Sequence, residues 1–253
     1  MSGSGRPRLR RLVPRLVRLD DGRRLRVFET GPADGPRIVL EAGVGATAHS
    51  WAAVVGPLAG RARVCAYDRA GYGGSDPAPG RRDPARLAAD LVELIDLLRA
   101  QDPLPGRPLV LVGHSLGGLI VRGAAAGLGQ AGRPPTGIVL VDPSDERCDA
   151  FFAPLARLAD SATALLLPAL AAMRAAPPEP GGIPVRTLSG VHAPPGLRRM
   201  RAQLRAAHRA SAAACADGAV IDAERSGHVV PFTEPRLVAE TALALAAAGG
   251  AGG

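Results

Sequence analysis

The stretch Leu109-Val-Leu-Val-Gly-His-Ser-Leu-Gly-Gly118 joins two apolar segments through a turn of small residues. Four aliphatic side chains precede Gly113, which is typical of a strand buried on both faces of a sheet. Leucine, isoleucine, valine and alanine then recur over residues 116–127, which predicts a helix. The stretch therefore predicts a strand, a sharp turn and a helix in direct succession.

Within this turn, Gly113, Ser115 and Gly117 form a Gly-x-Ser-x-Gly pattern. A serine on a strained strand-to-helix turn projects its hydroxyl above the sheet, and the backbone comes so close that only glycine fits two residues before and after it. We expect Ser115 to be a nucleophile. The N–H of Leu116, at the start of the helix, is expected to face developing negative charge. His114 is expected to pack beside the turn.

The rest of the chain alternates short apolar runs with helical segments. Leu87, Leu91 and Leu94 lie on one face of the clearest helix, for which Asp83 is a candidate N-cap. This alternation predicts an α/β fold with a mostly parallel central sheet and helices on both faces. The expected strands are Leu25–Glu29, Arg37–Leu40, Val64–Tyr67, Leu109–Val112, Ile138–Val141, Val185–Leu188 and Val220–Ala223, and the expected helices are Pro84–Arg99, Leu116–Gly127 and Glu234–Ala248.

The length of 253 residues fits one domain. We expect its core to comprise residues 23–143 and 183–250. Residues 144–182 contain Ala, Leu and several prolines but no clear strand, which favours a small helical cap inserted over the strand ends; two ordinary crossover helices are the alternative. Residues 1–22 are rich in arginine and are expected to form a solvated, partly disordered basic tail, with an anionic partner as the alternative.

The net charge is +8, yet the other arginines are scattered and no zinc-finger, helix-turn-helix or stacking motif accompanies them. We therefore expect no nucleic-acid partner. The three cysteines are far apart, which favours a reduced, cytoplasmic setting. The N-terminus lacks the apolar segment of a signal peptide, and the apolar runs are too short to span a membrane, so no stable membrane insertion is expected. Nothing in the sequence sets the oligomeric state.

Five stretches together resemble the α/β-hydrolase fold superfamily, and the likeness extends over residues 25–248. They are Leu40-Glu-Ala-Gly-Val-Gly45, Tyr67-Asp-Arg-Ala-Gly-Tyr-Gly-Gly-Ser75, Gly113-His-Ser-Leu-Gly-Gly118, Val139-Leu-Val-Asp-Pro143 and Ser226-Gly-His228. In this superfamily the catalytic residues follow the chain order serine, acid, histidine. The resemblance thus implies a base near the C-terminus, and His228, between the last predicted strand and helix, fits that place.

The position of the acid departs from the commonest pattern of the superfamily, which places it after the next-to-last strand. Residues 189–196 follow that strand here and contain no carboxylate. Asp142 instead ends the preceding strand, a position that haloalkane dehalogenases and pancreatic-type lipases of the same fold use. We expect Asp142 to be the acid, with Asp145 as the alternative. A third interpretation is that Asp142 has no catalytic role and only caps the segment that follows it.

The resemblance also implies a second backbone donor for an oxyanion. Members of the superfamily usually carry His-Gly after the third strand, and the N–H of the next residue enters the oxyanion hole. Ala42-Gly43 stands here instead, so Val44 is the implied donor.

These residues predict a serine hydrolase that acts on a small or medium carboxylic ester through an acyl-serine intermediate. An acyltransferase or perhydrolase with the same residues is one alternative, and a slow-turnover small-molecule binding or sensor protein is another. No HExxH motif, phosphate-binding loop or dinucleotide-binding pattern is present, so no metal or cofactor is expected.

Overall fold

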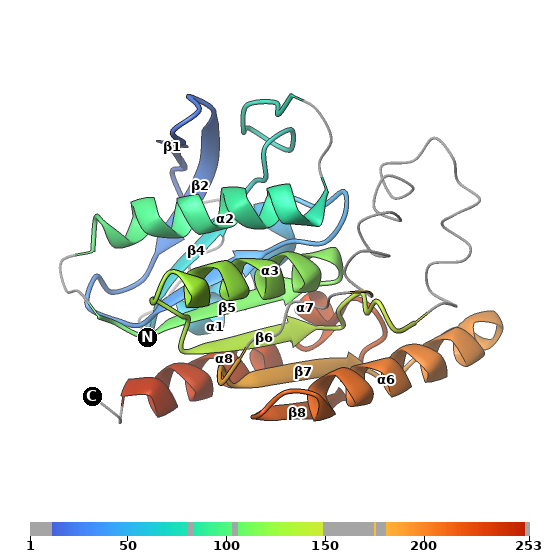
Figure 1. Ribbon diagram of the computed structural model, residues 1–253. Coiled ribbons are helices and arrows are strands. Elements are labelled where there is room, and N and C mark those ends of the chain that lie inside the picture. Colours follow the sequence, from blue (N-terminus) through green and yellow to red (C-terminus); the bar gives the residue numbers. More distant parts are fainter. Residues whose placement is uncertain (1–11, 80–82, 103–105, 149–174, 176–180, 251–253) are drawn as a thin grey trace, which may run out of the picture.

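An eight-stranded sheet runs through the molecule in the order β1-β2-β4-β3-β5-β6-β7-β8 (Figure 1). The computed structural model describes residues 12–79, 83–102, 106–148, 175 and 181–250. The strands are β1 (Arg15–Arg18), β2 (Arg24–Thr30), β3 (Arg37–Glu41), β4 (Arg63–Tyr67), β5 (Leu109–His114), β6 (Gly137–Val141), β7 (Val185–Gly190) and β8 (Gly218–Ala223).

All neighbouring strands from β4 through β3, β5, β6 and β7 to β8 pair in parallel. At one edge of the sheet, β2 pairs antiparallel with both β4 and β1. The parallel strands therefore direct their carboxyl ends to the same edge of the sheet, where side chains of open α/β folds gather into sites. The predicted α/β class with a mostly parallel sheet is confirmed.

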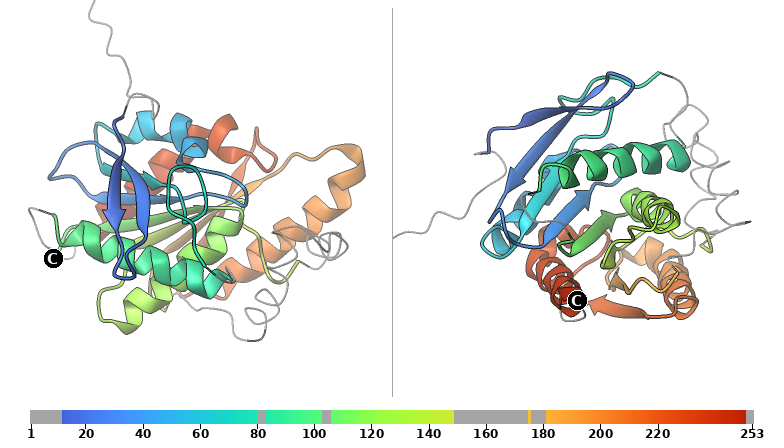
Figure 2. Two further views of the ribbon diagram at one scale, coloured as in Figure 1. Left: turned by 90° about the horizontal axis from the view of Figure 1, so that it is seen from above. Right: turned by 60° about the vertical axis from the view of Figure 1, so that its left-hand side comes forward.

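Helices cover both faces of the sheet (Figures 1 and 2). One face carries α2 (Pro84–Arg99), α3 (Leu116–Gln130) and α6 (Arg198–Ala213), and the other carries α1 (Ala52–Leu58) and α8 (Pro235–Gly250). Shorter helical turns lie in the loops; they are η2 (Ala48–Trp51), η5 (Pro195–Leu197) and α7 (Val230–Thr233).

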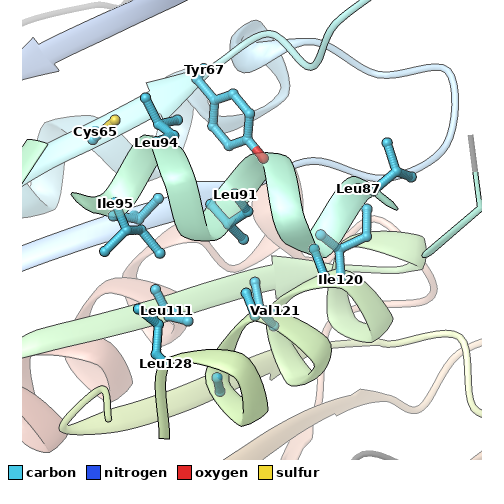
Figure 3. Packing of buried hydrophobic residues seen from close by; sticks show 14 of the residues in the cluster. Cys65, Tyr67, Leu87, Leu91, Leu94, Ile95, Leu111, Ile120, Val121 and Leu128 are labelled. Carbon is cyan, nitrogen blue, oxygen red and sulfur yellow. The ribbon is translucent and has the colours of Figure 1, made fainter. Parts of the chain in front are cut away.

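The core consists of one apolar cluster on each face of the sheet. Leu111 points into the cluster beneath α2 and α3, where Leu91 and Val121 are fully buried (Figure 3), while Val110 and Val112 belong to the opposite cluster. Strand residues of both orientations are thus buried, which explains why the strands read as continuous apolar runs. Each fully buried aliphatic side chain contributes about 1.5–3 kcal/mol.

Every predicted strand and helix is present, with differences confined to the ends. The helix α2 begins as expected: the Asp83 carboxylate accepts the Arg86 N–H at 2.9 Å, and Pro84 follows the cap. The sequence did not predict α1 and α6. The former is short and contains Pro57, and the latter buries Arg201 and His208 on the same face as Leu204, so its buried face does not appear in the sequence as an apolar stripe.

The expected boundary of the basic tail at residue 22 is wrong. Arg15–Arg18 form β1, which pairs antiparallel with β2, and Val17 and Leu19 are buried. Two apolar side chains between the arginines suffice for an edge strand, because its polar residues face solvent.

The predicted cap at residues 144–182 lies largely outside the described residues; its first part, Ser144–Glu146, is buried against the core. Among the helices that the structure describes, none is both long and apolar enough to cross a membrane.

Candidate active site

Ser115 occupies the turn between β5 and α3 with φ 53° and ψ −120°, a backbone conformation that costs energy for any residue with a side chain. The flanking glycines relieve the crowding. A Cβ on Gly113 would lie 2.3 Å from the Gly117 carbonyl oxygen, and one on Gly117 would lie 2.4 Å from that of Glu41. The close backbone approach expected from the Gly-x-Ser-x-Gly pattern is therefore present.

His228 lies in the loop after β8, at the same edge of the sheet as Ser115. Its Nε2 is 3.1 Å from the Ser115 Oγ, and its Nδ1 is 2.7 Å from the Asp142 Oδ2. Asp142 directly follows β6. The structure thus brings together in one hydrogen-bonded row three side chains that the sequence analysis selected, each from the end of a different parallel strand.

Asp142 is fully buried, and its carboxylate accepts several hydrogen bonds. It accepts hydrogen bonds from the Gly190 N–H at 2.9 Å and from the Arg201 Nη1 at 2.6 and 2.8 Å, besides the His228 ring. Burial acts to raise its pKa, but the bonds from His228 and Arg201 outweigh burial and lower the pKa to about 2. Asp142 is therefore a carboxylate at neutral pH, so the His228 Nδ1 must be the donor and the Nε2 is left to accept the Ser115 hydroxyl proton.

Asp145, the alternative acid, lies elsewhere. Its carboxylate accepts the Arg147 N–H at 2.9 Å and the Ser211 hydroxyl at 2.6 Å. No hydrogen bond joins it to His228 within the described part of the chain, so the geometry selects Asp142 as the partner of the imidazole.

His114 packs beside the turn, as expected from its place in the motif. Its Nε2 donates to the backbone carbonyl of His228 at 2.8 Å, and the two rings lie 4.9 Å apart. Burial, followed by the neighbouring His228, lowers the pKa of His114 to about 4. A neutral His114 therefore anchors the backbone of the loop that carries His228.

The loop after β3 lies against Ser115, since a Cβ on Gly43 would be 3.4 Å from the Ser115 Cβ. This loop carries Val44, which is 42% exposed, and Leu116 begins α3. The N–H of the first helical residue has no partner within its own helix. Both expected oxyanion donors thus lie on segments next to Ser115.

Two arginines of this region were missed by the sequence analysis. Arg201 lies on α6 and is 6% exposed; its sequence neighbourhood holds other arginines at helical spacing, so nothing marks the one that faces Asp142. Arg69 follows β4 and donates to the carbonyls of Ala42 and Gly43. The turn motif that contains Arg69 was recognised, but its contact with another loop depends on strand order.

Among the residues that the structure describes, no group of three or more His, Cys, Asp or Glu side chains is placed to hold a metal ion.

Comparisons with known proteins agree with this architecture. A family model described as the alpha/beta hydrolase fold matches residues 36–152, which include Ser115 and Asp142. The magnesium-chelatase 30 kDa subunit of Rhodobacter capsulatus is 38% identical over 95 residues, which are 37% of this chain and 31% of that protein. The putative carbamate hydrolase RutD of Variovorax paradoxus is 39% identical over 92 residues, 36% of this chain and 32% of that protein. The matched region thus spans about a third of each of these relatives.

Most of the chain also resembles solved structures. A putative aryl esterase from Burkholderia cenocepacia superposes with a TM-score of 0.62 at 22% identity, covering 94% of this chain and all of that one. At this identity the likeness concerns the fold. The sheet order, the family match over residues 36–152 and this superposition agree that the chain has the α/β-hydrolase fold.

Proposed function

We propose that this protein is a serine hydrolase that cleaves small or medium carboxylic esters through an acyl-serine intermediate. The observation that carries the proposal is the continuous row of hydrogen bonds from Ser115 through His228 to Asp142. Such a row activates a hydroxyl that is otherwise a weak nucleophile at neutral pH.

In the proposed reaction, the His228 Nε2 takes the Ser115 proton as the Oγ attacks the substrate carbonyl. Asp142 holds the ring through Nδ1 and stabilises the imidazolium that forms. The N–H groups of Leu116 and Val44 bind the oxyanion of the tetrahedral intermediate. His228 then protonates the leaving alcohol, and in the second half-reaction it activates a water molecule that releases the acid.

An ester is the proposed substrate because its alkoxide leaves more readily than the nitrogen anion of an amide. Transfer of the acyl group to an alcohol, thiol or peroxide would use the same residues and remains an alternative. A binding protein of slow turnover is a second alternative.

The test is hydrolysis of p-nitrophenyl esters of increasing acyl length, together with labelling by a fluorophosphonate probe. We expect S115A to lower turnover by about 10⁴-fold or more and to abolish labelling, because the nucleophile is lost. S50A removes a hydroxyl that, among the residues the structure describes, bonds only to the Thr47 carbonyl of its own turn, and this variant is expected to behave as the wild type.

Wild-type rates in S115A would contradict the proposal. A wild-type protein that neither turns over esters nor reacts with the probe would favour the binding protein, and a faster product release on addition of alcohol, thiol or peroxide would favour a transferase.

A further inference from the structure

Arg69 links the end of β4 to the loop that follows β3. Its Nη1 donates to the Ala42 carbonyl at 2.6 Å and to the Glu41 carboxylate, and its Nη2 donates to the Gly43 carbonyl at 2.5 Å. The Glu41 carboxylate also accepts the Tyr67 hydroxyl. One buried guanidinium therefore binds two successive carbonyl groups of a loop that passes beside Ser115.

Strand order places Arg69 and Ser115 on opposite sides of this loop. At the carboxyl edge, β3 lies between β4 and β5. Arg69 follows β4, whereas Ser115 follows β5. The Gly43 carbonyl accepts the Arg69 Nη2 from the β4 side, while a Cβ on Gly43 would point to the His114 and Ser115 side chains at the end of β5.

The Gly43–Val44 peptide bond is trans, as are all described peptide bonds. In a planar trans peptide the C=O and the N–H point in opposite directions. A carbonyl that is held toward Arg69 therefore turns the Val44 N–H away from β4 and toward the side on which Ser115 lies.

We propose that Arg69 is a positioning residue that presets the oxyanion hole, by fixing the Gly43–Val44 peptide with its N–H toward Ser115. The inference rests on the proposed acyl transfer at Ser115.

The surroundings of Arg69 suit a rigid anchor. Arg69 is 4% exposed and Glu41 is fully buried, and the Arg69 guanidinium lies 5.0 Å from the centre of the Tyr72 ring. Burial acts to lower the pKa of Arg69, but the charge of Glu41 raises it overall, so the cation persists. The peptide bonds on either side of a glycine such as Gly43 can change orientation readily, because glycine allows many backbone angles. A hydrogen bond from a rigid guanidinium to the Gly43 carbonyl removes that freedom.

The test compares the wild type with R69M/E41Q. The double change avoids leaving either member of a buried ion pair without its partner, which by itself would destabilise the fold. We expect kcat for p-nitrophenyl esters to fall by about 10²–10³-fold with little change in KM, the loss typical of one oxyanion donor. The pH dependence should be unchanged, because the Ser115, His228 and Asp142 side chains are intact.

R23M/D90N is the matched control. Arg23 and Asp90 form a bidentate, buried pair between the start of β2 and α2 that touches no carbonyl near Ser115. Its loss should leave kcat near the wild-type value, so a fall confined to R69M/E41Q separates positioning from loss of a buried ion pair.

A crystal structure of R69M/E41Q gives a readout that does not depend on turnover. We expect the Gly43–Val44 peptide to be flipped or to occupy two orientations. An unchanged peptide, or wild-type kcat in R69M/E41Q, would overturn the positioning role. If the wild type itself neither hydrolyses esters nor reacts with the probe but the peptide flips in the variant, the proposed function fails while the role of Arg69 stands.

Discussion

At the scale of single residues, the site contains a buried ion pair between Arg201 and Asp142. Arg201 and Asp142 are both shielded from solvent, whereas Arg205, one turn further along α6, and its partner Asp222 in β8 are more exposed. Removing one partner of a buried pair leaves an uncompensated charge, but exposed pairs contribute little.

We therefore expect R201M to lower the free energy of unfolding by about 3–5 kcal/mol and R205M by at most about 1 kcal/mol. Urea denaturation of both variants provides the measurement. Equal losses would show that the Arg201–Asp142 pair stabilises the fold no more than a surface contact does.

His114 is expected to make stability depend on pH. Its pKa is about 4 in the folded protein, against an ordinary value of 6.5. Between these values the unfolded chain binds a proton that the folded protein does not, so stability falls as the pH is lowered from about 6.5 toward 4. His114 alone should account for about 2 kcal/mol between pH 7.5 and pH 5.0.

H114Q removes this titration and retains a side-chain N–H for the His228 carbonyl. Urea unfolding at pH 7.5 and 5.0 should show a smaller loss in H114Q than in the wild type. Other titrating groups are common to both proteins and cancel in the comparison, so an equal loss would contradict the buried, neutral state of His114.

At the scale of elements, α2 shows how a local signal fixes a helix end. The Asp83 side chain accepts the Arg86 N–H, one of the N–H groups that the first turn leaves without a partner. We expect D83A to lower the free energy of unfolding by about 1 kcal/mol and D83S to retain most of it, since serine also caps. Thermal and urea denaturation measure both; a loss of the same size in D83S would argue against capping.

At the scale of the whole molecule, β1 protects the antiparallel edge of the sheet. A chain that begins at residue 19 lacks β1, its pairing with β2 and the buried Val17. We expect a lower urea midpoint and concentration-dependent association, because β2 becomes an open edge. A chain that begins at residue 12 keeps β1 and is the control; identical midpoints and monomeric behaviour in both would show that β1 adds no protection.

The elements of the parallel sheet were predictable because each one carries its own signal. Apolar runs marked β5 and β6, and the spacing of leucines with the cap at Asp83 marked α2. The segment containing β1 was misassigned, because two apolar residues among arginines resemble a solvated tail until a neighbouring strand offers hydrogen bonds. The helix α6 was missed, because its buried face includes Arg201 and His208, which no hydrophobic pattern identifies.

The sequence by itself determined the strand–turn–helix around Ser115, since the glycine spacing and the flanking apolar runs are local, and it selected His228 and Asp142 through their places after strands. Only the tertiary structure decided which groups meet at the site. The contacts of Arg201 with Asp142 and of Arg69 with Gly43 join segments far apart in the chain. Strand order and helix packing set such contacts, and the residues adjacent in sequence do not predict them.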